Sequence, residues 1–247
     1  MKKKLFESFL WAVILLAAIQ VQSSEISSFL SEKSKFNTDQ ITQVNSLIES
    51  AINEKLPEDY LVLRVREGVA KNVSFEILSE VIKEKIITLK VSTLLLNSRF
   101  EVKDMNKGKV KLLAEYLDRG LTINSFNELT REAKNKKVSL DRTLELLNIF
   151  VILKEKNIDR KYAAAVFVSM LGAEFSSKQF NESADLFSFS YAKSIEFNEA
   201  REIIIDGIKA GKSLSEIKGL FRKKILKEIK EEMKEYDKDK RPLEGTR

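Results

Sequence analysis

The sequence predicts an all-α protein in which stacked helical hairpins form a helical-repeat array. Composition is the first observation, because 247 residues with only 8 Gly and 2 Pro contain few helix breakers, and many of the rest are Lys, Glu, Leu and Ile. The second is periodicity, because apolar residues recur at spacings of three and four, whereas sustained alternation of apolar and polar residues is scarce. The third is an internal repeat. Together they predict about ten helices in the mature chain.

The repeat is clearest over residues 56–78, a stretch typical of helix, short turn and helix. Gly68, Ala133 and Gly207 each follow an acidic residue, and each precedes a serine by six residues. The hydroxyl of such a serine can cap the next helix, because it can accept a hydrogen bond from a first-turn backbone N–H. We expect Gly68 to loosen the end of its own helix. The three capping serines are Ser74, Ser139 and Ser213.

These segments also carry a resemblance. The sequences GVAKNV in the first repeat and GIKAGKS in the last resemble repeats of uncharacterised exported bacterial helical proteins, in which a GLP…EG-x-x-KG pattern recurs. The resemblance covers residues 56–78, fades over 121–140 and returns over 206–214. This chain departs from the pattern at Lys55, where the pattern has glycine, and at Asn72, where a second glycine is frequent. The resemblance implies a helical-repeat fold and a location in the cell envelope, and it implies no activity.

Residues 1–23 have the pattern of a secretory signal peptide. Three lysines at the start precede the apolar stretch 9–21, which is too short to span a bilayer comfortably. Val21 and Ser23 are small enough for the −3 and −1 positions of a cleavage site, so we expect cleavage after Ser23. An uncleaved N-terminal anchor is the alternative. Residues 24–37 are polar and rich in serine, and we expect a flexible leader there.

Apolar residues at helical spacing predict three helices in an N-terminal region of hairpins over residues 38–98. The expected helices run over about 38–53, 58–70 and 75–97. The later part of the third is rich in β-branched residues, which are common in strands. Its apolar positions nevertheless continue the helical period, and no hairpin partner is visible. The polar segment 99–109 contains a glycine, so we place a domain boundary there.

The second domain is expected to be a helical-repeat region over residues 99–235 that packs on the first. Asp159 can cap one of its helices, and Ser176 with Gln179 forms a capping-box pattern before another. Beyond residue 235 the chain is polar and charged, and we expect a disordered tail over 236–247. The other helices expected in this region lie near 110–119, 124–134, 140–155, 160–171, 198–209 and 214–235.

Two sets of apolar residues are candidates for an interaction surface. Phe180, Phe187 and Tyr191 share one face of the helix that follows Ser176. Aromatic residues at helical spacing usually belong to the core, and a ligand or peptide groove is the alternative. Ile229 and Met233 continue the apolar row of the last helix where lysine and glutamate fill its other faces. We expect the first half of that helix to pack on the body and its second half to project.

Composition and motifs argue against catalysis. The chain has no Cys and no His, which excludes disulfides, thiol chemistry and zinc or haem sites of the usual ligand types. A carboxylate site for Mg²⁺ or Ca²⁺ is compatible with the composition, but there is no calcium-binding loop pattern. Nucleophile-elbow, phosphate-loop and dinucleotide motifs are also missing. We therefore assign no catalytic residue, no cofactor and no metal.

The charge pattern completes the sequence-based hypothesis. The formal net charge is +6, and signal-peptide removal would take away three lysines and one glutamate, leaving +4. Both signs are interleaved along the chain, which is typical of a solvated helical surface and not of a nucleic-acid-binding one. We expect an exported, non-catalytic interaction or scaffold protein of the bacterial periplasm with a protein partner. The alternative is a peripheral envelope protein that contacts the membrane through its last amphipathic helix; an enzyme ranks third.

Overall fold

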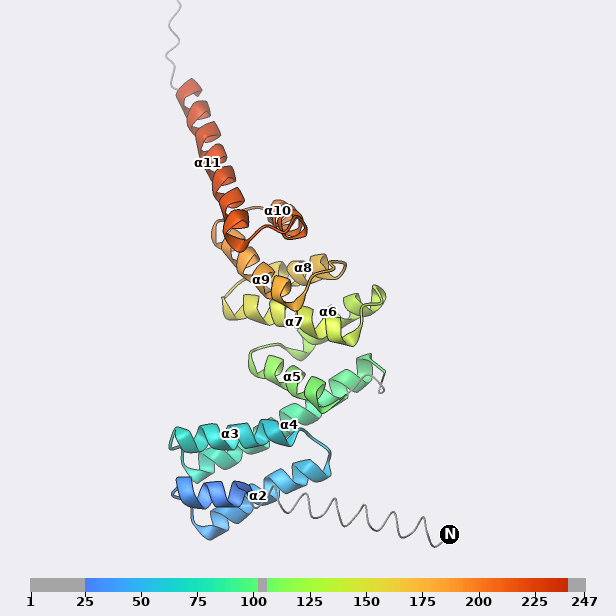
Figure 1. Ribbon diagram of the computed structural model, residues 1–247, viewed down its shortest axis with the longest axis vertical. Coiled ribbons are helices and arrows are strands. Elements are labelled where there is room, and N and C mark those ends of the chain that lie inside the picture. The colour runs from blue at the N-terminus through green and yellow to red at the C-terminus, as the bar shows by residue number, and fades with distance from the viewer. Residues whose placement is uncertain (1–24, 102–105, 240–247) are drawn as a thin grey trace, which may run out of the picture. The chain divides into compact units, whose positions relative to one another are not determined.

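The computed structural model describes residues 25–101 and 106–239, and within these ranges the chain consists of α-helices and the turns that join them (Figure 1). The fold is all-α, and helices adjacent in sequence pack on one another as hairpins. The helices are α2 (Thr38–Asn53), α3 (Glu58–Ala70), α4 (Phe75–Arg99), α5 (Lys107–Asp118), α6 (Ile123–Asn135), α7 (Leu140–Glu155), α8 (Arg160–Met170), α9 (Ser177–Ala192), α10 (Phe197–Lys209) and α11 (Leu214–Asp239). The expected signal peptide lies outside the described residues.

The chain divides into two compact units, residues 1–118 and 119–247. Unit 1 contains α2 to α5 and unit 2 contains α6 to α11. The division corrects the boundary predicted from the sequence, which placed residues 38–98 in one domain and 99–235 in the next. It falls later because α5 packs against α4 and buries Val110 and Leu113 in the core of unit 1.

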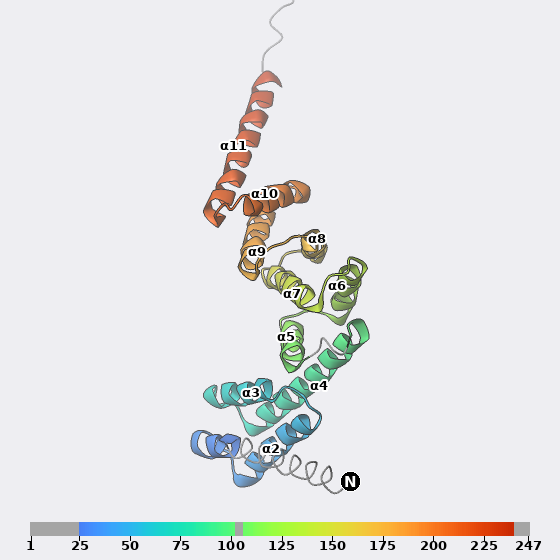
Figure 2. The same ribbon diagram turned by 45° about the vertical axis from the view of Figure 1, so that its right-hand side comes forward.

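The core of unit 1 forms where the apolar faces of α2, α3 and α4 meet. Figure 2 shows α3 lying beside α4, and the two pack together over much of α3. Each helix contributes residues at spacings of three or four, as an amphipathic helix must if one face is to be buried. The buried residues of these helices include Val44, Ile48, Tyr60, Leu61, Val65, Leu78, Ile82, Leu89 and Leu96.

A polar cluster joins α3, α4 and α5 at the edge of this core. The Asp118 carboxylate accepts a hydrogen bond from the Tyr60 hydroxyl, and the Nζ atom of Lys85 lies 2.8 Å from its Oδ1 atom. The guanidinium of Arg64 lies 4.9 Å from the centre of the Tyr60 ring. Burial, and then the hydrogen bond to Asp118, raise the pKa of Tyr60. The neutral phenol is therefore a permanent hydrogen-bond donor, and the cluster is a structural link.

One turn geometry joins most neighbouring helices. After α3, the N–H of Val73 donates to the carbonyl of Gly68 at 3.1 Å and the N–H of Asn72 donates to that of Val69 at 3.0 Å, which are the two bonds of a Schellman motif. Asn72 is left-handed, with φ of 51°, and two residues later the next helix is capped. The left-handed position of these turns is held by Lys55, Asn72, Gly120, Lys137, Asn157, Ser194 and Gly211.

The repeat glycines have a different role from the one expected. Gly68 and Gly207 lie inside α3 and α10 and do not loosen them. A Cβ atom added at Gly68 would lie 2.6 Å from Cδ1 of Leu78, and one added at Gly207 would lie 2.7 Å from Cγ1 of Ile217. Because both distances are shorter than a van der Waals contact, the missing side chain allows the next helix to approach closely.

The capping residues agree with the sequence-based prediction. The Ser74 hydroxyl accepts a hydrogen bond from the N–H of Ile77, and the Ser139 hydroxyl accepts one from the N–H of Arg142. Ser213 caps α11 in the same way, and Ser176 forms a complete capping box with the side chain of Gln179 at the start of α9. These bonds satisfy first-turn N–H groups that have no partner within the helix.

The core of unit 2 is centred on α7, which is buried on most of its circumference. A second contribution is aromatic: the ring of Tyr162 on α8 lies within 6.5 Å of Phe187 and 5.2 Å of Phe197, both edge to face. Edge-to-face pairs of this kind add to the free energy gained by burial. The buried residues of α7 are Leu140, Thr143, Leu144, Leu146, Leu147, Ile149, Phe150, Val151 and Leu153.

Two terminal predictions need correction. Residues 25–33 form a helix and not a flexible leader, because Ile26 and Leu30 are buried and the Asn45 side-chain amide of α2 donates to the Ser27 hydroxyl. At the other end, α11 runs to Asp239, so the first part of the tail expected to be disordered is helical; residues 240–247 lie outside the described ranges. None of the described helices is both long and apolar enough to cross a membrane.

Candidate binding groove

The aromatic face predicted as a possible surface is divided between core and exterior. Phe180 and Phe187 are buried, as is usual for aromatic residues at helical spacing, so neither belongs to the interaction surface considered as the alternative. The Arg142 guanidinium of α7 lies 3.6 Å from the centre of the Phe180 ring and donates to the carbonyls of Phe175 and Ala173. This contact covers the ring and fixes the connection before α9. Tyr191, in contrast, is exposed.

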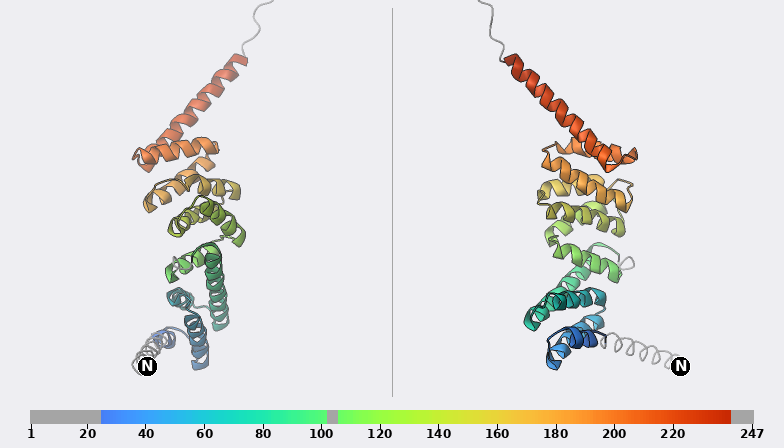
Figure 3. Two further views of the ribbon diagram at one scale, coloured as in Figure 1. Left: turned by 90° about the vertical axis from the view of Figure 1, so that its right-hand side faces the viewer. Right: turned by 60° about the vertical axis from the view of Figure 1, so that its left-hand side comes forward.

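The second half of α11 has the exposed apolar residues that the sequence predicts. Phe221 in the first half is fully buried, whereas every residue from Leu226 to Glu235 is exposed. Leu226, Ile229 and Met233 keep 58%, 45% and 62% of their surface exposed, and their spacing puts them on one face. We refer to these three residues as the distal strip. Figure 3 shows α11 extending beyond α9 and α10, on which its first half packs.

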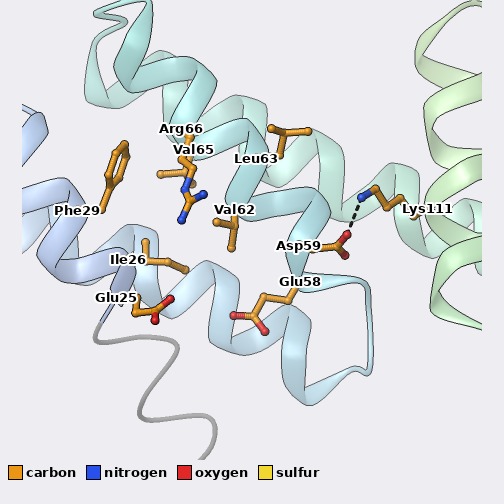
Figure 4. Close-up of a pocket in the computed structure, with 10 residues that line it drawn as sticks. All are labelled: Glu25, Ile26, Phe29, Glu58, Asp59, Val62, Leu63, Val65, Arg66 and Lys111. Atoms are coloured by element: carbon orange, nitrogen blue, oxygen red, sulfur yellow. Dashed lines mark hydrogen bonds and ion pairs between the residues drawn. The ribbon is translucent and has the colours of Figure 1, made fainter.

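A groove on unit 1 is the most developed candidate site in the described chain. It has a volume of about 370 Å³ and lies between the helix at 25–33 and α3, with Lys111 of α5 at one end (Figure 4). That volume lies within the range of known ligand sites, roughly 300–1,000 Å³. The residues that line it are Glu25, Ile26, Phe29, Glu58, Asp59, Val62, Leu63, Val65, Arg66 and Lys111.

The groove has apolar walls because two amphipathic helices face each other across it. Ile26 and Val65 are buried beneath it, and Val62 is half-buried and points into the space between the helices (Figure 4). Leu63 stands at the rim, where 43% of its surface is exposed. On α3, the lining residues Glu58, Val62 and Arg66 are four residues apart, so they lie on one face of the helix. That face supplies the apolar wall and a charged residue at each end of it.

The charged groups of the groove are unevenly paired. Asp59 forms an ion pair with Lys111, with 2.5 Å between the Oδ2 and Nζ atoms. The carboxylates of Glu25 and Glu58 face one another across the groove (Figure 4), and neither forms an ion pair with another described residue. At the other end, the exposed guanidinium of Arg66 lies 5.8 Å from the centre of the Phe29 ring.

The environment of Glu58 disfavours its ionised form. Burial makes the largest contribution and raises the pKa of this carboxyl group; the ammonium of Lys107 opposes the shift, and the carboxylates of Asp59 and Glu25 add to it. A partly buried carboxylate that forms no ion pair and lies against an apolar wall attracts a further cationic group. Guanidinium and ammonium groups supply both the charge and the hydrogen-bond donors that carboxylates accept.

The arrangement of the lining residues is suited to binding a ligand. Among the described residues, no group of three or more carboxylates is placed so that it could hold a metal ion. What the groove offers is an apolar trough, carboxylates at one end and a guanidinium at the other.

Sequence reasoning missed this groove because it treated residues 24–37 as a leader. One wall consists of the helix at 25–33, whose apolar residues Ile26, Phe29 and Leu30 stand three and four apart. That spacing is the signal that could have revealed a short amphipathic helix. The other wall, on α3, was predicted correctly as a helix, but which face remained open depended on the packing.

Comparisons with protein-family models, with curated proteins and with solved structures find no match to this chain. Function therefore has to be argued from the site itself. The groove of unit 1 combines a cavity with two carboxylates that form no ion pair with another described residue, and it is therefore the site considered further.

Proposed function

We propose that the chain is an exported, non-catalytic interaction protein of the bacterial periplasm that binds a segment of a protein partner in the groove of unit 1. The observation that carries the proposal is the Glu25–Glu58 carboxylate pair, which lies beside an apolar wall and forms no ion pair with another described residue. A basic side chain placed between these carboxylates would offset the unfavourable free energy of keeping Glu58 ionised. The partner segment is therefore expected to present Lys or Arg next to an apolar side chain.

A protein segment fits the groove better than a compact small molecule. The groove is an open trough between two helices, and stacked helical hairpins commonly use such surfaces for protein recognition. Its volume of about 370 Å³ accommodates a few side chains. An amphipathic helix laid in a groove places anchors at every third or fourth residue, which matches a trough lined by residues at that spacing.

Export is the part of the proposal that rests on residues 1–23. The only tryptophan of the chain, Trp11, lies within that segment. A protein cleaved after Ser23 therefore has no tryptophan fluorescence and begins at Ser24. Intact-mass measurement of the protein extracted from the cell envelope decides the matter, and a species that retains the first 23 residues would contradict cleavage.

A peptide-display selection tests the binding function. The mature chain is used to select from a library of randomised helical peptides, and we expect enrichment of sequences in which Lys or Arg adjoins Leu, Ile, Met or Phe. The variant Glu58→Lys should lose these peptides, because it places a positive charge where the basic side chain would bind. The matched control is Ile87→Lys, at a position on α4 that is 61% exposed and lies outside the groove. Selection of acidic peptides, or equal binding by both variants, would overturn the proposal.

A peripheral membrane protein is the second candidate. It is favoured by the exposed distal strip of α11, next to which lie Lys223, Lys230 and Lys234. Lysine-flanked apolar faces bind anionic membranes by combining apolar burial with electrostatic attraction. Sedimentation with vesicles that contain an anionic phospholipid tests it: retention that is lost on Ile229→Asp would favour this candidate over the groove.

A further inference from the structure

The chain itself carries a segment with the chemistry that the groove requires. The distal strip presents three exposed apolar side chains, and a lysine comes directly after each of them in the sequence. We infer that the distal strip of one copy docks into the groove of a second copy, so that the protein self-associates head to tail. This inference rests on the proposed function, because it identifies the partner segment for the same site.

The apolar parts of the two surfaces match in size. The groove of about 370 Å³ has room for a few aliphatic side chains, and Ile229 and Met233 stand one helical turn apart on α11. Neither residue is covered by the rest of unit 2, since both are exposed. Burying them against Val62 and Phe29 would remove apolar surface from water on both copies, which favours association.

The charges of the two surfaces are also complementary. Successive helical residues are about 100° apart, which puts Lys230 and Lys234 on one side of the distal strip and Glu232 on the other. None of the three forms an ion pair with another described residue. In the groove, the carboxylates of Glu25 and Glu58 stand at one end and the Arg66 guanidinium at the other. One orientation of the docked helix therefore brings lysines to the carboxylates and a glutamate to the guanidinium.

The mode of association follows from the two surfaces being different. A contact between unlike patches is heterologous, so a pair of copies keeps a free acceptor on one copy and a free donor on the other. Repetition of the contact gives a closed ring or an open chain of copies. Such growth depends on protein concentration, and because exposed charges contribute to it, it weakens as salt is added.

Paired variants of the full mature chain test the inference by sedimentation velocity. The donor-deficient variant carries Ile229→Asp and Met233→Asp, and the acceptor-deficient variant carries Glu58→Lys; all three substitutions are at exposed or half-buried positions. We expect the unsubstituted protein to form a concentration-dependent series of species beyond the dimer. Each variant alone should be monomeric, with association weakened at least about tenfold. An equimolar mixture of the two should give a 1:1 dimer that grows no further.

The outcomes separate this inference from the function on which it rests. A mature chain that stays monomeric at all concentrations, or variants that associate like the unsubstituted protein, would overturn head-to-tail docking. Peptide selection by the groove would then still support the binding function. Self-association that persists in both variants and is lost on Ile87→Asp would place the contact on α4 and would also overturn the inference. Thermal melts of each variant confirm that it is folded.

Discussion

At the repeat positions Gly68, Ala133 and Gly207, the size of the residue is matched to the side chain ten positions later. The two glycines face the large residues Leu78 and Ile217 of the next helix. The alanine is fully buried, and the equivalent later position holds the smaller Thr143, also buried. Where the first helix of a hairpin has glycine, the second helix has a large side chain; where the first has alanine, the second has a smaller one. Such a balance of side-chain sizes is what close packing requires.

Substitution at these crossings should destabilise the protein. For Gly207→Ala, the new Cβ atom would lie within 2.9 Å of two Ile217 side-chain atoms. We expect a net loss of about 1 kcal/mol, because overpacking costs roughly 1–3 kcal/mol and better helix propensity returns about 1. Gly68→Ala should cost less, since it meets the end of the more flexible Leu78 side chain. Denaturant melts measure both changes.

The control for this effect is Gly219→Ala, where nothing lies within 4 Å of the added atom. It should be neutral or stabilising, because alanine favours the helix. Combining Gly207→Ala with Ile217→Val should cost less than the sum of the two changes, since the second relieves the crowding caused by the first. Strictly additive losses would show that close approach of α10 and α11 is not the reason.

The pKa of Glu58 gives the groove a specific pH dependence. Burial and the neighbouring carboxylates of Asp59 and Glu25 raise this pKa, against the opposing effect of Lys107. A protonated carboxyl group cannot pair with a basic side chain, so binding of a selected peptide should weaken as the pH falls through the raised pKa. The loss should begin at a higher pH than for an ordinary glutamate, which titrates near about 4.3.

Titration calorimetry at a series of pH values checks this prediction. In the variant Glu58→Gln the peptide should bind more weakly at neutral pH, and most of the pH dependence should disappear. Unchanged affinity and an unchanged pH profile in the variant would show that Glu58 does not contact the peptide.

At single residues, the sequence is informative about caps and much less so about turns. Ser74 was recognisable because serine before a helix has a direct hydrogen-bonding reason. The left-handed residues Lys55, Lys137 and Ser194 were not recognisable, because glycine or asparagine is the usual choice for that conformation. Each of these residues stands at the left-handed position of a short turn between two consecutive helices.

At the scale of the helix, α11 is the clearest case of a single element with two environments. Its first half buries Ile217 and Phe221, and Lys224 forms an ion pair with Glu199 of α10. Its second half is held by pairs within the helix, such as Lys227 with Glu231 at 3.8 Å. Exposed pairs of this kind contribute only a few tenths of a kcal/mol each.

Removal of the second half should therefore leave stability nearly unchanged. Truncation after Lys227 retains Ile217 and Phe221, which are buried, and removes Ile229 and Met233; every residue from 228 to 235 is exposed. We expect an almost identical melting temperature together with loss of self-association. The control is Phe221→Ala, which empties a fully buried site and should cost about 3–5 kcal/mol. A large fall in melting temperature on truncation would show that the distal half belongs to the core.

Most helices could be predicted because their evidence is local. The expected bounds of α3 and α7 match the structure, since an apolar period marks both helices, Pro57 precedes α3 and the capping residue Ser139 precedes α7. The helix at 25–33 was missed because serines dominate its composition, and α5 was assigned to the wrong unit. That assignment is decided by contacts such as Lys85 with Asp118, which lie 33 residues apart in sequence.

At the scale of the molecule, the two candidate surfaces differed in how far the sequence predicted them. The distal strip was visible as an apolar row among lysines and glutamates, and the structure confirms that Ile229 and Met233 are exposed. The groove was not visible, because it exists only when the helix at 25–33 packs near α3. Phe180 and Phe187 share a helical face but are buried. Aromatic residues at helical spacing therefore do not by themselves distinguish a core face from a binding face.

The measurement that tests the binding function most directly is site-specific photo-cross-linking in cells of the source organism. A photoreactive residue in place of Leu63, on the rim of the groove, should give a discrete cross-linked product with a partner protein, or with a second copy of the chain. The same residue at Ile87, which is exposed on α4 away from the groove, should give none. The Leu63 product should disappear when Glu58→Lys is added. Equal products from both positions, or a Leu63 product that survives the charge reversal, would contradict a binding groove on unit 1.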